Sequence, residues 1–300
     1  MSSTLYIIFP MSVLRRIRET ISRRYPEATL LATGLHDELF AFASRFGQRE
    51  IPSLTVSSYP QFYYHMRALS HEGRLAALPP GLPPLRKELA DIGMTPPLRA
   101  FCVVAVVPGI ICVSAGLNTE VNDWSDMCSP DFPGVVGCPP KNTPFPFLTA
   151  NVLRRVAGKD AENLLARLDT ASTHLDINKR LARNELSAAF AIPSFSRSFR
   201  GGNGKMIWPA SGALAIPILA CLSASAPPEA AEVLAYILSK EFQETLSQDG
   251  LLVPVREGVC GFEELEANQW KMFWPGWDCL EEVGEEMLRT VSLENLTILS

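Results

Sequence analysis

The sequence predicts an α/β protein in which short apolar strands alternate with helices, and three observations support this class. First, strand-like and helix-like segments follow one another through the N-terminal quarter. Second, residues 208–255 contain a turn, an apolar strand, a helix that begins at proline and a short strand. Third, 47% of the 300 residues are apolar, which is enough to bury the core of one large domain or two moderate ones. Such alternation predicts mainly parallel sheets with helices on both sides.

The N-terminal quarter contains three predicted strands and two predicted helices. Tyr25-Pro26 ends the first helix, because proline cannot continue one, and Gly34 precedes the second helix. The expected elements are, in order, a strand at residues 5–9, a helix at about 12–24, a strand at 29–32, a helix near 37–46 and a strand at 51–57.

The middle of the chain contains a Pro-rich segment followed by a long apolar run. Residues 78–97 hold six prolines and two glycines, which indicates an irregular surface loop. The run from Phe101 to Leu117 is rich in β-branched residues, and Pro108-Gly109 interrupts it. We therefore expect a β-hairpin or a bent strand pair there, not a membrane helix. No uncharged apolar window of about eighteen residues occurs, so no membrane insertion is expected.

The segment from Trp208 to Val255 predicts one strand and one amphipathic helix. Pro227-Pro228 suits a helix start, where a missing N–H costs nothing, and Gly250 suits its end, where a left-handed residue is favoured. Between them, apolar residues recur at three- and four-residue steps and form a single stripe: Val233, Leu234, Ile237, Leu238, Phe242 and Leu246.

This segment resembles the C-terminal part of extracytoplasmic solute-binding proteins of ABC transporters, and the closest subgroup is the ferric-iron, small-anion or polyamine type. A second match lies near mid-chain. There Asp123–Met127 is similar to the family's Trp-Asp-Asp-Leu-like turn, and Pro130–Val136 contains its step of proline, aromatic residue and glycine. The N-terminal quarter also fits. The matched segments cover most of the chain at low similarity, and their order carries the resemblance.

The resemblance implies the type II periplasmic-binding fold, in which two lobes, each a mainly parallel sheet flanked by helices, are joined by a two-stranded hinge. Lobe one is then expected at residues 1–103 plus 209–275, lobe two at 104–208, and a C-terminal helix at 276–300 on either lobe. It implies a monomeric binder, not an enzyme. Such a protein captures a small polar or anionic ligand, or a metal complex, between the hinged lobes for an ABC permease or for sensing.

Ligands of open α/β sheets bind beyond the carboxyl ends of the strands, where helix N-termini favour anions. The candidate ligand-binding residues are therefore those that follow the predicted strands. The alternative for each serine or threonine is helix capping. The candidates are Ser12, Thr33, Gly34, Ser57, Ser58 and Tyr59 in lobe one, Asn142, Thr143 and Ser194 in lobe two, and Trp208 and Ser211 near the hinge.

The sequence predicts no resident metal or cofactor. Iron-binding members of the family use two adjacent tyrosines of lobe two, whereas Phe195–Phe199 at the corresponding place contains none. The tandem Tyr63-Tyr64-His65 falls in lobe one, and adjacent side chains on a helix do not face the same way. Cys128 and Cys138 are ten residues apart and lack the spacing of a zinc site.

The composition also bears on other classes of function. The net charge of −5 and the scattered basic residues argue against nucleic-acid binding. Two alternatives stay open: an enzyme on this fold with a Cys or Ser site, and an interaction module whose cleft is filled by Phe195, Phe199 or Trp208. Seven cysteines and the absence of a signal peptide in the sequence as written predict a cytoplasmic protein, or a periplasmic or cell-surface one if a leader was removed.

Overall fold

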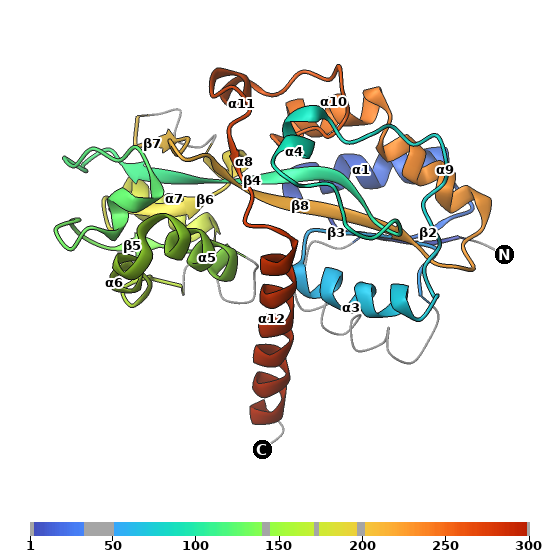
Figure 1. Cartoon of the computed structure of the whole chain (residues 1–300). Helices are drawn as coiled ribbons and strands as arrows, with labels where there is room; N and C mark the ends of the chain where they lie inside the picture. The colour runs from blue at the N-terminus through green and yellow to red at the C-terminus, as the bar shows by residue number, and fades with distance from the viewer. Residues whose placement is uncertain (1–2, 33–50, 140–144, 171–173, 197–201, 299–300) are drawn as a thin grey trace. The chain divides into compact units, whose positions relative to one another are not determined.

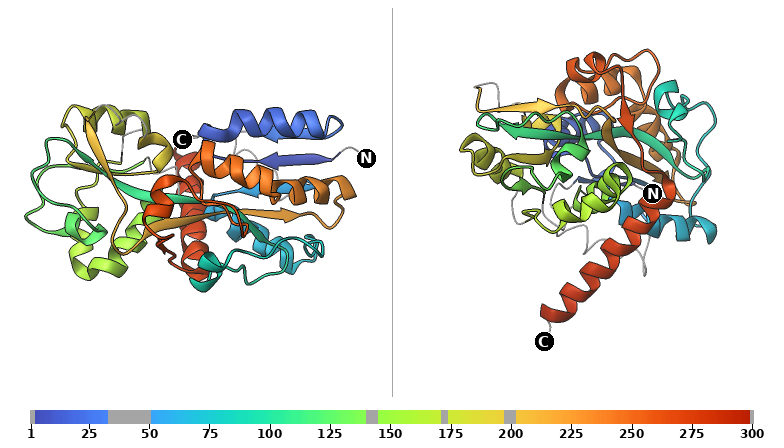
Figure 2. Two further views of the ribbon diagram at one scale, coloured as in Figure 1. Left: turned by 90° about the horizontal axis from the view of Figure 1, so that it is seen from above. Right: turned by 60° about the vertical axis from the view of Figure 1, so that its left-hand side comes forward.

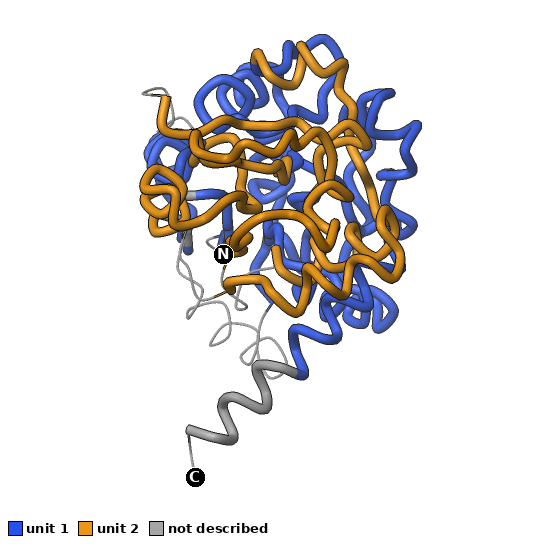
Figure 3. Tube along the Cα trace, turned by 90° about the vertical axis from the view of Figure 1, so that its left-hand side faces the viewer, with its two compact units in different colours: residues 1–106, 217–262, 276–300 blue, residues 107–216, 263–275 orange. Residues whose placement is uncertain are grey.

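The computed structural model describes residues 3–32, 51–139, 145–170, 174–196 and 202–298 (Figure 1). The chain forms two compact units, coloured separately in Figure 3. Unit 1 comprises Met1–Val106, Pro217–Phe262 and Gly276–Ser300, and unit 2 comprises Val107–Ile216 and Glu263–Pro275. The expected lobe one ended at residue 103 and resumed at 209, whereas unit 1 ends at Val106 and resumes at Pro217. Residues 263–275, expected in lobe one, belong to unit 2.

The sheet of unit 1 has the order β2-β1-β3-β8, formed by β1 (Thr4–Ile7), β2 (Thr29–Ala32), β3 (Leu54–Ser57) and the second half of β8 (Ala213–Leu222). β1 runs parallel to both β2 and β3, whereas β8 runs antiparallel to β3. The carboxyl ends of β1, β2 and β3 therefore lie at one edge of the sheet, where the helices that follow them begin.

Helices cover both faces of this sheet. Figures 1 and 2 show α1 and α9 on one face and α3 on the other. Val13, Ile17 and Ile21 of α1 are buried, as the spacing of an amphipathic helix requires. The described helices of unit 1 are α1 (Met11–Arg24), α3 (Pro60–His71), α4 (Lys87–Asp91), α9 (Pro228–Ile237), α10 (Lys240–Gly250) and α12 (Trp277–Ile298), and α12 packs on α3.

The prediction of one continuous helix over the apolar stripe of residues 233–246 is wrong, because α9 ends at Ile237 and α10 begins at Lys240. Ser239 separates them: its hydroxyl accepts a hydrogen bond from the N–H of Phe242 at 3.3 Å and caps α10. Leu251, at φ 52°, takes the left-handed position expected of Gly250. A Cβ on Gly250 would lie 2.6 Å from Val13 Cγ1, so glycine is needed there for close packing on α1.

The prediction of a hairpin or bent strand pair at 101–117 is also wrong. β4 is a single strand of 13 residues, Cys102–Ser114, that continues through Pro108-Gly109 from unit 1 into unit 2. A Cβ on Gly109 would lie 3.1 Å from Leu214 Cβ and 3.3 Å from Phe145 Cε1. This glycine therefore marks a close approach of neighbouring groups and not a turn.

In unit 2, β4 runs antiparallel to β6 (Ala188–Ala191) and to β7 (Gly204–Ile207), and β5 (Val136–Gly137) runs parallel to β6. β9 (Met272–Phe273) pairs with the first residues of β8. The helices of unit 2 are α5 (Phe145–Ala157), α6 (Ala161–Leu165), α7 (His174–Ala182), α8 (Pro193–Ser196) and α11 (Glu263–Ala267), with short 3-10 turns at Trp124–Cys128 and Gly158–Asp160.

The strands expected at 5–9, 29–32 and 51–57 and the helix expected at 12–24 differ from the structure only at their ends, by up to three residues. The segment at 78–97, expected to be an irregular loop, contains the short helix α4, and the short strand expected at the end of 208–255 is reduced to an isolated bridge between Val253 and Val106. The helix expected near 37–46 lies outside the described residues. Among the helices that the structure describes, none combines the length and the apolar character needed to cross a bilayer.

Candidate functional site

The candidate site of unit 1 is the edge at which β1 and β3 end. The N–H of Ile8 donates to the carbonyl of Val56 at 2.9 Å, so the two strands stay paired up to this edge. α1 then begins at Met11 and α3 at Pro60. Neither helix has a side-chain cap on its first turn. Because helix N-termini carry free N–H groups and partial positive charge, this edge favours an anionic or polar group.

Three of the predicted residues lie together after β3. Ser57 is buried, and its hydroxyl accepts a hydrogen bond from the N–H of Tyr59 at 3.2 Å. Tyr59 is also buried, and burial, followed by the nearby Tyr6, raises the pKa of its phenol. Ser58 between them is half-buried. Ser12, exposed in the first turn of α1, follows the neighbouring strand.

The sequence reasoning missed Gln61, in the first turn of α3. This side chain is only 4% exposed, and neither its amide nitrogen nor its amide oxygen has a hydrogen-bond partner among the described residues. A buried polar atom without a partner costs about 1–3 kcal/mol. Such a group needs an explanation, and a ligand that supplies the missing hydrogen bonds is one.

In unit 2, the corresponding edge lies after β5 and β6, which run parallel. Ser194 follows β6 by three residues, and its buried hydroxyl oxygen has no hydrogen-bond partner among the described residues. The backbone there is fixed from α7, because the Asn178 side chain donates to the carbonyl of Phe195 at 2.7 Å. Ser194 therefore presents an unsatisfied hydroxyl from a fixed turn.

Trp208 and Ser211 belong to a different place in unit 2. Trp208 Nε1 donates to the carbonyl of Lys271 at 2.7 Å. The hydroxyl of Ser211 donates to Asp123 Oδ1 at 2.6 Å, within the turn that carries the family-like motif. Trp124 of that turn is 1% exposed and donates to the carbonyl of Gly212 at 3.0 Å. These contacts fasten the start of β8, which is a structural role for both predicted residues.

Comparison with known proteins identifies the family of the chain. A family model described as bacterial extracellular solute-binding protein matches residues 50–283, more than half of the 300 residues. The chain belongs to this family. The resemblance found in the sequence is thereby confirmed, and the protein is a solute-binding protein of a family described as extracellular. No curated protein matches the chain.

Solved structures with the same fold include ferric ion-binding proteins. The chain is similar to the apo ferric ion-binding protein A of Pasteurella haemolytica, with a TM-score of 0.75, 11% identity and coverage of 97% of this chain and 96% of that one. For the ferric binding protein of Campylobacter jejuni, the TM-score is 0.74 at 13% identity, covering 96% and 98%. The Trichodesmium protein IdiA (FutA), in complex with iron and citrate ligands, gives 0.68 at 13%, covering 96% and 98%. At these identities they show the fold alone, and they confirm the predicted type II periplasmic-binding class.

The tyrosine tandem of this solute-binding protein packs into unit 1. Tyr63 is 1% exposed, and its ring centroid lies 5.3 Å from those of Phe101 and Trp277. Burial raises the pKa of Tyr63 to about 12. Within the described ranges, no three His, Cys, Asp or Glu side chains gather closely enough to hold a metal ion.

Four predicted residues, Thr33, Gly34, Asn142 and Thr143, lie outside the described residues, as does Phe199. Of the described candidates, the structure brings Ser12, Ser57, Ser58 and Tyr59 to one edge of unit 1 and places Ser194 at the edge of unit 2. Trp208 and Ser211 lie elsewhere in unit 2, where Trp208 bonds to Lys271 and Ser211 to Asp123.

Proposed function

We propose that this solute-binding protein is a monomer that captures a small polar or anionic solute, or a metal ion already complexed by an anion, and delivers it to an ABC permease. It acts by binding, without chemical turnover. The contacts come from neutral donors and acceptors and from helix N-termini: Ser12, Ser58 and Gln61 are the proposed contacts in unit 1, and Ser194 is the proposed contact in unit 2. Thr33, Gly34, Asn142 and Thr143 belong to the same proposal on their sequence positions alone.

The observation that best supports this proposal is the buried side-chain amide of Gln61. Its amide has one group that donates and one that accepts, and both are buried without partners among the described residues. A solute with an oxyanion or carboxylate accepts from the amide N–H, and a hydroxyl or amine on the same solute donates to the amide oxygen. Binding then satisfies two groups whose hydrogen bonds were lost to burial, and the binding free energy includes that gain.

The chemistry of the described residues also supports a complexed rather than a bare metal ion. Tyr59 and Tyr63 are buried, and the part of the chain that the structure describes holds no group of three His, Cys, Asp or Glu side chains that could bind a metal ion. The segment that would supply lobe-two tyrosines begins with Phe195 instead. An iron–citrate complex, as named for the Trichodesmium neighbour, would bring its own anionic oxygens. Those oxygens suit amide, hydroxyl and helix N–H donors.

A thermal-unfolding screen tests the proposal. The probes are inorganic phosphate, sulfate, citrate, ferric citrate, spermidine and a set of amino acids, each added to the purified chain. A probe at a hundred times its dissociation constant adds about 2.7 kcal/mol to the free energy of unfolding. We expect at least one anion or polar solute to stabilise the wild-type chain, and Gln61→Met to reduce that stabilisation. The proposal is contradicted if the probe stabilises both chains equally.

A second candidate function is ligand sensing in a reducing compartment, and the cysteines favour it. All seven are free, and five of them are buried. Burial raises the pKa of Cys128 to about 11, so its thiol stays protonated and unreactive. Separating the cytoplasmic and extracytoplasmic fractions of producing cells distinguishes the two functions: transport places the protein outside the cytoplasm and sensing by this form places it inside.

A further inference from the structure

Two of the free cysteines lie on neighbouring strands of unit 1. Cys102 is the first residue of β4, and Cys221 lies near the end of β8. The two strands are adjacent in the sheet. Because β4 leads from unit 1 into unit 2 and β8 leads back, they run antiparallel. Which residues of the two strands face each other then decides whether the two thiols meet.

The register of the strands places Cys102 opposite Cys221. A Cβ on Gly109 would lie 3.1 Å from Leu214 Cβ, so these two positions face each other. In an antiparallel pair, each step forward along one strand is matched by one step back along the other. Seven residues before Gly109 in β4 is Cys102, and seven residues after Leu214 in β8 is Cys221.

A proline in β8 agrees with this register. Pro217 then faces Val106, whose N–H and carbonyl both bond to Val253 and therefore point away from β8. Because proline has no N–H to donate, it suits a position at which no hydrogen bond crosses between the strands.

The two cysteines occupy the same kind of position. Every second residue of a strand bonds toward the same edge, so Cys102, four residues before Val106, directs its backbone groups away from β8. Ser223 donates to the carbonyl of Ser53 on the β3 side, so Cys221, two residues earlier, directs its own groups away from β4. Opposite residues at such a position have Cα atoms about 4.5 Å apart. Disulfides span Cα separations of roughly 4.4–6.8 Å.

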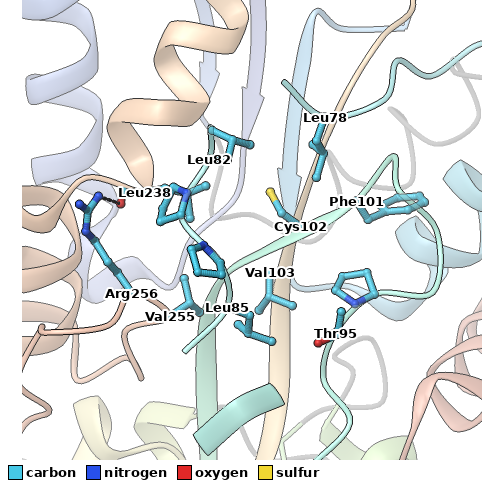
Figure 4. A pocket seen from close by; sticks show the side chains of 13 residues that line it. Leu78, Leu82, Leu85, Thr95, Phe101, Cys102, Val103, Leu238, Val255 and Arg256 are labelled. Atoms are coloured by element: carbon cyan, nitrogen blue, oxygen red, sulfur yellow. Dashed lines mark hydrogen bonds between the residues drawn. The ribbon is translucent and has the colours of Figure 1, made fainter. Parts of the chain in front are cut away.

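The surroundings of the thiols agree with a close pair. Burial raises the pKa of Cys221 and the neighbouring Cys102 raises it further, which indicates that the two side chains lie near each other. Cys221 is 1% exposed. Cys102 is half-buried in the wall of a cavity of about 230 Å³, beside Leu78, Phe101 and Val103 (Figure 4). A small reagent that enters this cavity therefore meets Cys102 first.

We propose that Cys102 and Cys221 form a cross-strand disulfide bond when the protein meets a small disulfide oxidant, such as oxidised glutathione. The Cys102 thiolate attacks one sulfur of the oxidant, and one glutathione thiolate leaves. The Cys221 sulfur, after losing its proton, attacks the Cys102 sulfur and displaces the second glutathione. The two released thiolates take up the two protons, so two protein thiols are oxidised and one glutathione disulfide is reduced.

The compartment and the burial of the thiols decide when this bond forms. The family is described as extracellular, and disulfides persist in oxidising compartments of that kind. Burial raises the pKa of Cys102 to about 12, so little thiolate exists at neutral pH and uncatalysed exchange is slow. The bond links the two strands that continue between the units. It shares no residue with the proposed solute site and does not depend on it.

The test follows the mass of the full chain while the reduced protein is incubated with oxidised glutathione at mildly alkaline pH, which raises the thiolate fraction. Every chain carries Cys260→Ser, because this exposed thiol would otherwise take up glutathione. We expect the mass to fall by two hydrogen atoms and to recover with dithiothreitol. Digestion of the oxidised chain should give a peptide that joins Cys102 to Cys221.

Two further variants separate this pair from the other cysteines. Cys221→Ser is expected to stop at a glutathione adduct, because no second thiol displaces the glutathione. Cys112→Ser is the matched control, since Cys112 is a buried residue of the same strand that faces Ala189 and Met206. It is expected to lose two hydrogen atoms as the parent chain does.

A second reaction removes the dependence on access to the buried thiols. The parent chain is unfolded in urea and refolded with reduced and oxidised glutathione, so that both thiols meet the oxidant. We expect the same linked peptide, and a higher urea midpoint for the oxidised than for the reduced protein, because the bond restricts the unfolded chain. Three results would overturn the proposal: no link between Cys102 and Cys221 in either reaction, a link between a different pair of cysteines, or a lower urea midpoint for the oxidised protein.

Discussion

Two buried glutamines of unit 1 differ in their hydrogen bonding. Gln243 in α10 is 0% exposed, and its amide nitrogen donates to the carbonyls of Val104 and Ile237 at 2.8 and 3.0 Å. Its amide oxygen accepts from the N–H of Val255 at 2.8 Å. Gln61 in α3 is 4% exposed, and neither amide atom has a partner among the described residues. The same side chain is thus a structural link in one helix and an unsatisfied group in the other.

The difference separates polar groups that serve folding from those available to a ligand. Gln243 joins three segments, the end of α9, β4 and the chain after α10, and it satisfies backbone groups that burial would otherwise leave unpaired. Gln61 makes no hydrogen bond to the described residues, so we expect it to cost stability in the ligand-free protein. A group that is costly without a ligand and sits where strands end is expected to contribute to binding.

The largest expected effect comes from removing the satisfied glutamine. Gln243→Met keeps the volume of the side chain but leaves two carbonyls and one N–H buried without partners. We expect a loss of about 3 kcal/mol or more in the free energy of unfolding, measured by urea denaturation. A loss below about 1 kcal/mol would mean that the three hydrogen bonds contribute little, and would remove the contrast with Gln61.

For Gln61, in contrast, we expect substitution to raise the free energy of unfolding. Gln61→Met removes two unpaired polar atoms at nearly constant volume, so the ligand-free protein gains about 1 kcal/mol in the same measurement. The variant also loses stabilisation by the solute that protects the wild-type chain. Destabilisation of the ligand-free variant would show that Gln61 is a structural residue like Gln243.

Two serines differ in the same way as the two glutamines, and their substitution is expected to change stability the least. Ser247 is 0% exposed, and its hydroxyl donates to the carbonyl of Cys260 at 2.9 Å, whereas the hydroxyl of Ser194 in unit 2 has no partner among the described residues. We expect Ser247→Ala to cost about 1 kcal/mol and Ser194→Ala to leave stability unchanged or slightly higher. Only Ser194→Ala should weaken solute binding. Equal losses of stability in the two variants would show that Ser194, like Ser247, has a structural role.

The sequence predicted the elements whose signals are local. Apolar runs located the strands at Thr29–Ala32 and Leu54–Ser57, and the order of motifs led to the right family. The helix break at Ser239 was missed because the apolar stripe continues across it. Pro108-Gly109 was taken for a turn because its cause, the approach of Leu214 and Phe145, comes from distant parts of the chain.

The candidate site was only partly predictable, because it too depends on contacts between distant parts of the chain. Positions after strands are visible in a sequence, which is how Ser57, Ser58 and Ser194 were chosen. Whether a hydroxyl or amide is already satisfied depends on tertiary contacts, as the bond from Ser211 to Asp123 shows. Gln61 lies one residue after a proline that starts a helix, which is the available sequence signal, but nothing local distinguishes it from Gln243.

The most direct test of Gln61 as a ligand contact is a nitrogen–proton NMR spectrum of the chain labelled only in glutamine, with the side-chain NH2 signals assigned through Gln61→Met and Gln243→Met. The protein is titrated with phosphate and, separately, with citrate. We expect at least one anion to shift the Gln61 NH2 signals in a saturable way, while those of Gln243 stay in place. Unmoved Gln61 signals with both anions, or equal shifts of the two glutamines, would contradict a role of Gln61 in ligand binding.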